Sequence, residues 1–306
     1  MDQNKSKNAL VIRPGSIGDL ILTVPVFISL QKNNFDVYLI GNEKVNGFFE
    51  ERRIIKKGIA FGDVRLTEFF TKIKKILIPD FPEFDLVLSY IEENSIFSQN
   101  LDITFGKKVI FYPLKEEPEC HMTEYILQPL KSIGIKVYYP ETDKKNFNDI
   151  LFIHPGSGSK KKNWPKENFL KIYYHFSSKI ECKLILGECE MDNYEYWEKN
   201  VGKQNLILPK NISELSHKLE IGSYFIGNDS GVSHLAAFLG LEAFIIFGPT
   251  DPKIWAPTYK NVRIIKTSID CSPCDRAKRD KCIDIICLKK IAAQDIIHLL
   301  ENEMGR

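Results

Sequence analysis

The sequence has no run of about 18 apolar residues, the length at which a helix can cross a bilayer. Its beginning, MDQNKSKNALVIRPG, also lacks the apolar stretch of a signal peptide. The net charge is only +2, from 42 basic and 40 acidic side chains, so no overall charge draws the chain to nucleic acid. These absences predict a cytoplasmic protein that has no transmembrane helix and no nucleic-acid partner.

Two motifs of nucleotide-binding enzymes are also missing. The turn at residues 14–19, PGSIGD, does not follow the dinucleotide pattern G-x-G-x-x-G, and no acidic residue after it is placed for a ribose. This argues against a nicotinamide enzyme. No convincing Asp-x-Asp motif precedes a candidate ligand site. If the protein binds a diphosphate, we therefore expect positive groups of the chain, rather than a divalent ion, to neutralise it.

Cysteine is scarce outside one segment. Seven cysteines in a cytoplasmic chain argue against a disulfide framework. Four of them fall in residues 271–287, CSPCDRAKRDKCIDIIC, with the spacing C-x2-C-x7-C-x4-C. Four thiolates at this spacing could surround one structural zinc or iron ion; the alternative is reduced thiols or a pair that oxidises. The candidate ligands are Cys271, Cys274, Cys282 and Cys287.

Short apolar stretches alternate with helical patterns along the whole chain, which predicts an α/β fold with parallel sheets covered on both faces. The polar segment 138–149 predicts a linker. We expect one domain at 1–146, a second at 147–290 and a final helical segment at 291–306. Strands are predicted at 9–13, 36–40, 54–61, 85–90, 108–112, 150–154, 183–187, 205–208, 225–227, 243–247 and 262–266, and helices at 20–31, 69–75, 123–133, 212–219, 231–239 and 292–303.

Residues 223–255 contain the strongest local pattern. A buried strand ends at Gly227 and is followed by Asp229 and Ser230, whose side chains can cap a helix that starts at Gly231. The free N–H groups and the dipole of such a helix attract an anion, most simply a phosphate. His234, one turn into the helix, could add a donor or a cation. An ordinary capped helix with a structural histidine is the alternative.

A second candidate phosphate site is the loop in residues 154–169, HPGSGSKKKNWPKENF. Small residues, hydroxyls such as that of Ser157, and lysines such as Lys162 suit a diphosphate, although a solvated basic loop has the same composition. An acidic residue after the strand at 183–187 could bind ribose hydroxyls. Glu190 is the favoured candidate over Glu188 and Asp192, and the start of a surface helix is the alternative.

The turn after the first strand is the third candidate site. Gly15 and Gly18 let the backbone approach a ligand closely, and Ser16 lies between them. Asp19 follows at the start of a helix, where its carboxylate could accept a proton from a hydroxyl. The alternative is that Asp19 only interacts with the helix dipole.

These three stretches resemble motifs of glycosyltransferase family 9, the ADP-heptose:lipopolysaccharide heptosyltransferases. The stretches are RPGSIGDLILTVPVFISL, HPG with K-x-WP, and DSGVSHLAA followed by FGPTDPKIWAP. The resemblance implies the GT-B fold: two Rossmann-like domains with parallel sheets that face each other across a cleft. It also implies that Asp19 is the general base, that Lys162 contacts the donor diphosphate, and that the final helix packs back on the first domain.

The implied reaction is an inverting transfer of a sugar, heptose from ADP-heptose, to a glycan or lipid-linked glycan of the lipopolysaccharide core. No cofactor is implied for the chemistry, and peripheral contact with the inner leaflet of the membrane is compatible with such an acceptor. Two alternatives stay open: another GT-B enzyme such as a nucleotide-sugar epimerase, and a non-catalytic nucleotide-sugar-binding or assembly module. The residues themselves do not identify the sugar, the base or the acceptor.

Overall fold

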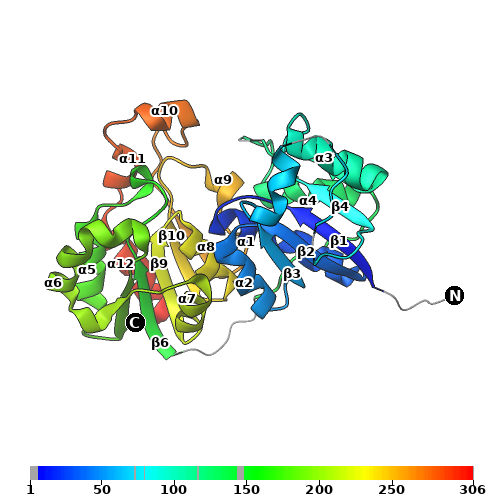
Figure 1. The fold of residues 1–306 in the computed structure, drawn as a ribbon. Helices are drawn as coiled ribbons and strands as arrows, with labels where there is room; N and C mark the ends of the chain where they lie inside the picture. The colour runs from blue at the N-terminus through cyan, green and yellow to red at the C-terminus, as the bar shows by residue number, and fades with distance from the viewer. Residues whose placement is uncertain (1–5, 72–73, 79, 116, 143–147, 306) are drawn as a thin grey trace. The chain divides into compact units, whose positions relative to one another are not determined.

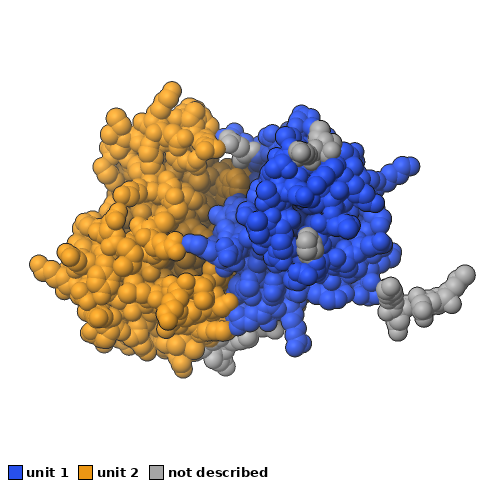
Figure 2. All heavy atoms as spheres, viewed as in Figure 1, with its two compact units in different colours: residues 1–140 blue, residues 141–306 orange. Residues whose placement is uncertain are grey.

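The computed structural model of the chain describes residues 6–71, 74–78, 80–115, 117–142 and 148–305. The chain forms two compact units, Met1–Pro140 and Glu141–Arg306, which Figure 2 colours separately. The division falls within the segment predicted as a linker, a few residues before the predicted boundary at 146. None of the helices that the structure describes is both long enough and apolar enough to cross a bilayer.

The first unit is built on a five-stranded parallel sheet with the order β3-β2-β1-β4-β5 (Figure 1). The strand β1 forms because four successive apolar residues, 9–12, can be buried on both faces of the sheet. Helices α1, α2 and α4 pack together on one face, and η1 and α3 share a hydrophobic cluster with the strands on the other. The elements are β1 (Lys7–Ile12), α1 (Ile17–Lys32), β2 (Phe35–Gly41), α2 (Glu43–Glu51), β3 (Lys57–Ala60), η1 (Val64–Phe70), β4 (Leu86–Ser89), α3 (Ile96–Phe105), η2 (Gly106–Lys108), β5 (Val109–Phe111) and α4 (Met122–Ser132).

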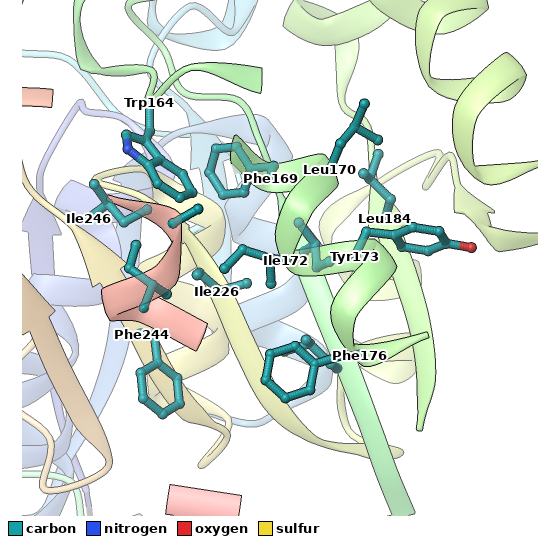
Figure 3. Packing of buried hydrophobic residues seen from close by; sticks show 14 of the residues in the cluster. Trp164, Phe169, Leu170, Ile172, Tyr173, Phe176, Leu184, Ile226, Phe244 and Ile246 are labelled. Carbon is teal, nitrogen blue, oxygen red and sulfur yellow. The ribbon is translucent and has the colours of Figure 1, made fainter. Parts of the chain in front are cut away.

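The second unit contains a six-stranded parallel sheet with the order β11-β10-β9-β6-β7-β8. A hydrophobic core lies between the sheet and helices α5, α6 and α12, where Trp164, Phe169 and Phe176 are fully buried (Figure 3). Helix α8 packs on β9 and β10 and also contacts α7. The strands are β6 (Asn148–His154), β7 (Glu181–Ile185), β8 (Leu206–Ile207), β9 (Gly222–Asn228), β10 (Glu242–Ile246) and β11 (Val262–Ile265).

The helices of this unit follow the strands in regular alternation. They are η3 (Lys160–Lys162), α5 (Lys166–Phe176), η4 (Glu188–Asn193), α6 (Tyr194–Val201), η5 (Lys203–Asn205), α7 (Ile212–Leu219), α8 (Gly231–Phe238), α9 (Pro252–Trp255), α10 (Arg276–Lys281), α11 (Ile286–Lys289) and α12 (Ala293–Met304). The predicted strands and most of the predicted helices are therefore present, with shifted ends.

Both sheets have a topological switch point, where the direction of the strand order reverses. In the first unit it lies between the adjacent strands β1 and β4, and in the second between β6 and β9. Ligands of open α/β sheets bind beyond the carboxyl ends of such strands. The residues that follow Ile12, Ser89, His154 and Asn228 are therefore the places to look for a site.

The helix predicted at 69–75 is wrong. The 3₁₀ helix η1 ends at Phe70, and the described residues Lys74 and Ile76 are not helical. Their main-chain N–H groups donate to side chains of α3 instead: Lys74 to Asn100 Oδ1 at 2.8 Å, and Ile76 to Thr104 Oγ1 at 3.0 Å. Partners about 26 to 28 residues away in the sequence thus replace helical hydrogen bonds.

Helix α12 contributes to the core of the second unit through Ile296, Ile297 and Leu300. The packing on the first domain that the resemblance implies stays a prediction. The helix packs against α5, and Glu301 accepts hydrogen bonds from His175 and Lys179, each at 2.8 Å. The last helix is therefore part of the α-helical layer that covers its own sheet.

Candidate active site

The loop between β6 and α5 is fastened to the end of β9 by one buried amide. Asn228 Oδ1 accepts a hydrogen bond from the Trp164 N–H at 2.9 Å, and its Nδ2 donates to the Pro155 carbonyl at 2.8 Å. The Trp164 indole N–H donates to the Ile291 carbonyl at 3.1 Å. Both ends of the loop are thus held, so the residues between them occupy a defined place at the switch point.

Lys162 lies where the sequence predicts a phosphate contact. Its Nζ is 3.0 Å from Asp229 Oδ2, and the Thr250 hydroxyl donates to the same oxygen at 2.7 Å. The Asp229 side chain is 7% exposed and the Lys162 side chain 22%. Asp229 was expected to share in capping helix α8; its carboxylate is instead the counter-ion of Lys162. Lys162 is thereby held at the carboxyl ends of the strands with its side chain partly exposed.

The other two lysines of the loop have different partners. Lys160 is exposed and lies 3.8 Å from Asp192. Lys161 donates to the carbonyls of Arg279 and Asp280 in helix α10, the former at 3.0 Å. Of the three lysines, Lys162 is the one placed against the start of α8.

Helix α8 begins at the carboxyl end of β9. Ser230 is its N-cap and its hydroxyl accepts the Ser233 N–H at 3.3 Å, as the sequence predicts. Gly231 is the first helical residue, and His234 lies buried in the first turn. The N–H groups of this first turn and the helix dipole form a positive region close to Lys162 and Asp229.

Ser157 shapes the loop from within. Its side chain is mostly buried, its hydroxyl lies 2.6 Å from Asn163 Oδ1, and it accepts the Ser159 N–H at 3.3 Å. These hydrogen bonds show that the Ser157 hydroxyl stabilises the folded loop. A contact with a ligand stays a prediction.

Glu190 folds inward beneath the loop. Its carboxylate accepts the Gly187 N–H at 2.7 Å and lies 3.7 Å from His154 Nε2, and His154 Nδ1 lies 3.3 Å from Ser230 Oγ. Burial acts to raise the pKa of Glu190, but His154 and the Gly187 N–H outweigh it and hold the pKa below its ordinary value. A Cβ at Gly156 would lie 1.7 Å from the carboxylate. Glu190 thus supports the loop, and its predicted ribose contact stays a prediction.

In the first unit, Asp19 lies in the first turn of α1, next to the switch point. Its Oδ2 accepts the Ser16 N–H at 2.8 Å and the Ser16 hydroxyl at 2.7 Å. Its Oδ1 lies 3.3 Å from Arg13 Nη2, and the side chain is 28% exposed. The capping role that was the alternative interpretation is therefore present, and one oxygen remains directed at Arg13 rather than at the helix.

Arg13 is a buried cation that the sequence analysis did not single out. Burial lowers its pKa, and the charge of Asp19 opposes this effect. A buried guanidinium without a counter-ion is costly, and Asp19, 3.3 Å away, is the counter-ion of Arg13. The adjacent Gly15 has no room for a side chain, because a Cβ there would lie 2.9 Å from Asp19 Cβ and 3.1 Å from Arg13 Nη1. Gly18, also predicted at the site, is a buried residue within α1.

The cysteine segment does not support the predicted metal site. In the described part of the chain, no group of three or more His, Cys, Asp or Glu residues is placed to hold a metal ion. Cys287 belongs to the hydrophobic core, and burial, together with the neighbouring thiols of Cys274, Cys271 and Cys282, raises its pKa to about 11. The segment is attached by other means: Ser272 Oγ donates to the Gly248 carbonyl at 2.6 Å, and the Cys274 N–H to the Pro249 carbonyl at 2.7 Å.

Several residues that stabilise the site were not predicted, because their residue types do not indicate a function. Asn228, His154 and Gly156 act through contacts within the protein, and Thr250 lies far along the chain from the aspartate that it binds. Position offers the one usable signal: His154 and Asn228 are the last residues of two strands that flank the switch point.

Comparison with known proteins assigns the class. Residues 123–283, just over half of the 306 residues, match the model of the family described as "Glycosyltransferase family 9 (heptosyltransferase)". The protein is thus a glycosyltransferase, and its two Rossmann-like units with parallel sheets are those of the GT-B fold. It belongs to glycosyltransferase family 9, as its three sequence motifs predict.

Relatives and solved structures agree with this assignment. The chain is 25% identical over 287 residues to lipooligosaccharide heptosyltransferase 2 of Campylobacter jejuni, covering 85% of this chain and 88% of that protein. Its fold is similar to that of a family 9 glycosyltransferase from Veillonella parvula, with a TM-score of 0.76, 17% identity, and 99% and 98% of the two chains covered. ADP-heptose lipopolysaccharide heptosyltransferase II of E. coli gives a TM-score of 0.68, 13% identity and coverage of 96% and 98%.

Replacing Gly15 by alanine should disturb Asp19. The new methyl group would lie 2.9 Å from Asp19 Cβ, so the carboxylate must move. We expect a loss of glycosyl transfer of about ten- to a hundredfold, since displacements of about 1 Å at a reacting group have effects of this size. Initial rates of nucleotide release measure it. Gly47→Ala is the control, because a Cβ at Gly47 meets nothing within 4 Å. Equal rates for both variants would contradict the prediction.

Glu190 should give the second unit part of its acid sensitivity. Because its pKa is lowered on folding, the ionised form stabilises the native state above the ordinary value of 4.5, and this contribution is lost as the pH falls through the folded value. Glu190→Gln should be less stable than the wild type near neutral pH and should lose less stability on acidification. Melting temperatures between about pH 7 and about pH 3.5 test this. Glu195→Gln, an exposed carboxylate of α6, is the control; parallel curves for all three proteins would exclude this role.

Proposed function

We propose that this protein transfers heptose from ADP-heptose to a sugar of a lipopolysaccharide or lipooligosaccharide core, with inversion at the anomeric carbon. The membership in family 9 supports the reaction class. The names of similar proteins, lipooligosaccharide heptosyltransferase 2 and ADP-heptose lipopolysaccharide heptosyltransferase II, support the donor and the acceptor. The structural observation that carries the proposal is the placement of Lys162 beside the start of α8 at the switch point of the second unit.

In this proposal, the second unit binds the donor diphosphate. Main-chain N–H groups from Gly231 onward and the Ser230 hydroxyl donate to phosphate oxygens, and Lys162 adds a positive charge. His234, in the same turn, and Ser157, in the facing loop, complete the set of contacts. Negative charge grows on the diphosphate as the bond to the anomeric carbon breaks, so these preorganised groups stabilise the transition state more than the bound donor.

Asp19 supplies the base. A hydroxyl of the acceptor gives its proton to the Asp19 carboxylate while its oxygen attacks the anomeric carbon, and ADP leaves from the opposite side with the bonding electron pair. Attack opposite to the leaving group inverts the configuration. Arg13 pairs with the carboxylate and fixes the direction of Oδ1.

Replacing Asp19 by asparagine tests the base directly. An amide cannot take the proton, so kcat should fall by about 10²- to 10⁴-fold, while calorimetric binding of ADP stays unchanged. Asp19 also caps α1, so the control must separate the two roles. Ser16→Ala removes a hydroxyl that donates a hydrogen bond to Asp19 but keeps the carboxylate. The kcat of this variant should fall far less. A rate for Asp19→Asn close to that of Ser16→Ala would show that Asp19 only stabilises the helix.

Replacing Lys162 by alanine tests the diphosphate site. Loss of one charge-assisted contact of about 1.5–3 kcal/mol should weaken ADP binding by about ten- to a hundredfold. Lys160→Ala is the matched control, because Lys160 is exposed and its partner is Asp192. Isothermal titration with ADP gives both affinities, and circular dichroism checks that the unpaired Asp229 has not unfolded the unit. Unchanged affinity in Lys162→Ala would remove this residue from the site.

A further inference from the structure

The first unit contains a cavity of about 490 Å³ that none of the predicted site residues except Gly15 lines. It lies at the carboxyl ends of β1, β2 and β3, on the edge of the sheet where α/β proteins bind ligands. Its size is within the range of small-molecule sites, about 300–1,000 Å³. The lining residues are Pro14 and Gly15 after β1, Gly41, Asn42 and Glu43 around the end of β2, and residues 60–64 at and after the end of β3.

One wall of this cavity, formed by Gly15, adjoins Asp19. A Cβ added at Gly15 would lie 3.2 Å from Asp19 Oδ2. Asn42 fixes the wall, because its Nδ2 donates to the Gly15 carbonyl at 2.9 Å. The absence of a side chain at residue 15 therefore brings the cavity close to the carboxylate. A sugar in the cavity would lie within a short distance of the start of α1.

The charges of the lining are negative. No Lys, Arg or His lines the cavity, whereas Glu43 and Asp63 do. Asp63 is balanced by Arg65, which donates to its two oxygens at 2.9 and 2.8 Å and holds its pKa at about 2. Glu43 is exposed and adds a further negative charge at the mouth. Carboxylate and amide oxygens accept hydrogen bonds from hydroxyl groups, and the carboxylates repel a ligand that carries a negative charge.

The cavity also has an apolar part. Phe61 and Val64 belong to the lining. The Phe61 ring is fixed by Phe70 and Phe97, whose ring centroids lie 5.4 and 5.3 Å away. A rigid aromatic surface next to hydrogen-bond acceptors fits a sugar ring, which has one face rich in C–H groups and hydroxyls around its edge.

We propose that this cavity holds the terminal sugar of the acceptor, and that this sugar is a neutral pyranose rather than one that carries a carboxylate or a phosphate. The inference rests on the proposed function, since it takes the acceptor hydroxyl to be the one that Asp19 deprotonates. Glu43 and Asn42 accept hydrogen bonds from sugar hydroxyls, and Phe61 covers the C–H face.

The test compares two sugars that differ in one group: a methyl heptoside, and the same glycoside oxidised to a carboxylate at its terminal carbon. Their affinities for the full-length protein without donor are measured by saturation-transfer NMR. We expect the neutral glycoside to bind at least about fivefold more tightly, because the carboxylate meets Glu43. Glu43→Lys should reduce this preference to about twofold or less. Glu83→Lys makes the same charge change at an exposed residue before β4, at the amino end of that strand and not at the carboxyl ends. It should leave the preference intact.

Three results would overturn the inference: equal or tighter binding of the carboxylate by the wild type, equal effects of Glu43→Lys and Glu83→Lys, or no binding of either glycoside. A separate assay of ADP release from ADP-heptose tests the proposed function. If the neutral preference and its dependence on Glu43 are found but ADP-heptose is not consumed, the proposed donor fails while the neutral sugar site stands.

Discussion

The side-chain amide of Asn228 is the contact on which the loop between β6 and α5 depends. It is fully buried at the end of β9, and it bonds both to the beginning of the β6–α5 loop and to the Trp164 N–H at its end. Without it, a buried N–H and a buried carbonyl would lose their partners, at a cost of about 1–3 kcal/mol for each. The loop that it holds carries Lys162, so the same amide also determines that Lys162 reaches Asp229.

The two units have the same architecture, but the accessible charged groups at their switch points have opposite signs. Each places a helix start at the switch point of a parallel sheet, α1 in the first unit and α8 in the second. Beside α8 the accessible charged group is Lys162, whose counter-ion Asp229 is buried. Beside α1, Arg13 is buried and the accessible charge belongs to Asp19, with Glu43 and Asp63 nearby in the lining of the cavity. This distribution suits an anionic donor in one unit and an uncharged sugar in the other.

The fold could be predicted because it depends on local patterns. Buried parallel strands require continuous apolar runs, and these are visible at residues 9–12 and 243–246 without any structure. The positions of the candidate ligand-binding loops could also be predicted, because ligands of such sheets bind beyond the carboxyl ends of the strands. Lys162 could be chosen only by its resemblance to the family motif; its pairing with Asp229, 67 residues away, required the structure.

The failures have the same origin. In place of the helix expected at 69–75, the N–H groups of Lys74 and Ile76 donate hydrogen bonds to Asn100 and Thr104, which no local sequence pattern predicts. The metal site expected from the cysteine spacing in 271–287 finds no support in the described residues, where Cys287 is part of the core and Ser272 and Cys274 hydrogen-bond to the Gly248 and Pro249 carbonyls. The contact of Glu190 with the buried His154 could not be predicted from the residue type, and its ribose contact stays a prediction.

The central claim is that the ends of β6 and β9 form the binding site for a nucleotide diphosphate. Amide hydrogen exchange of the whole protein with and without ADP tests it most directly, because an N–H group that donates a hydrogen bond to a bound phosphate oxygen exchanges more slowly. The account predicts that ADP slows exchange at residues 157–163 and 229–234 and leaves residues 14–19 and 41–43 unchanged. Protection confined to the first unit, or no protection at either loop of the second unit under saturating ADP, would contradict it.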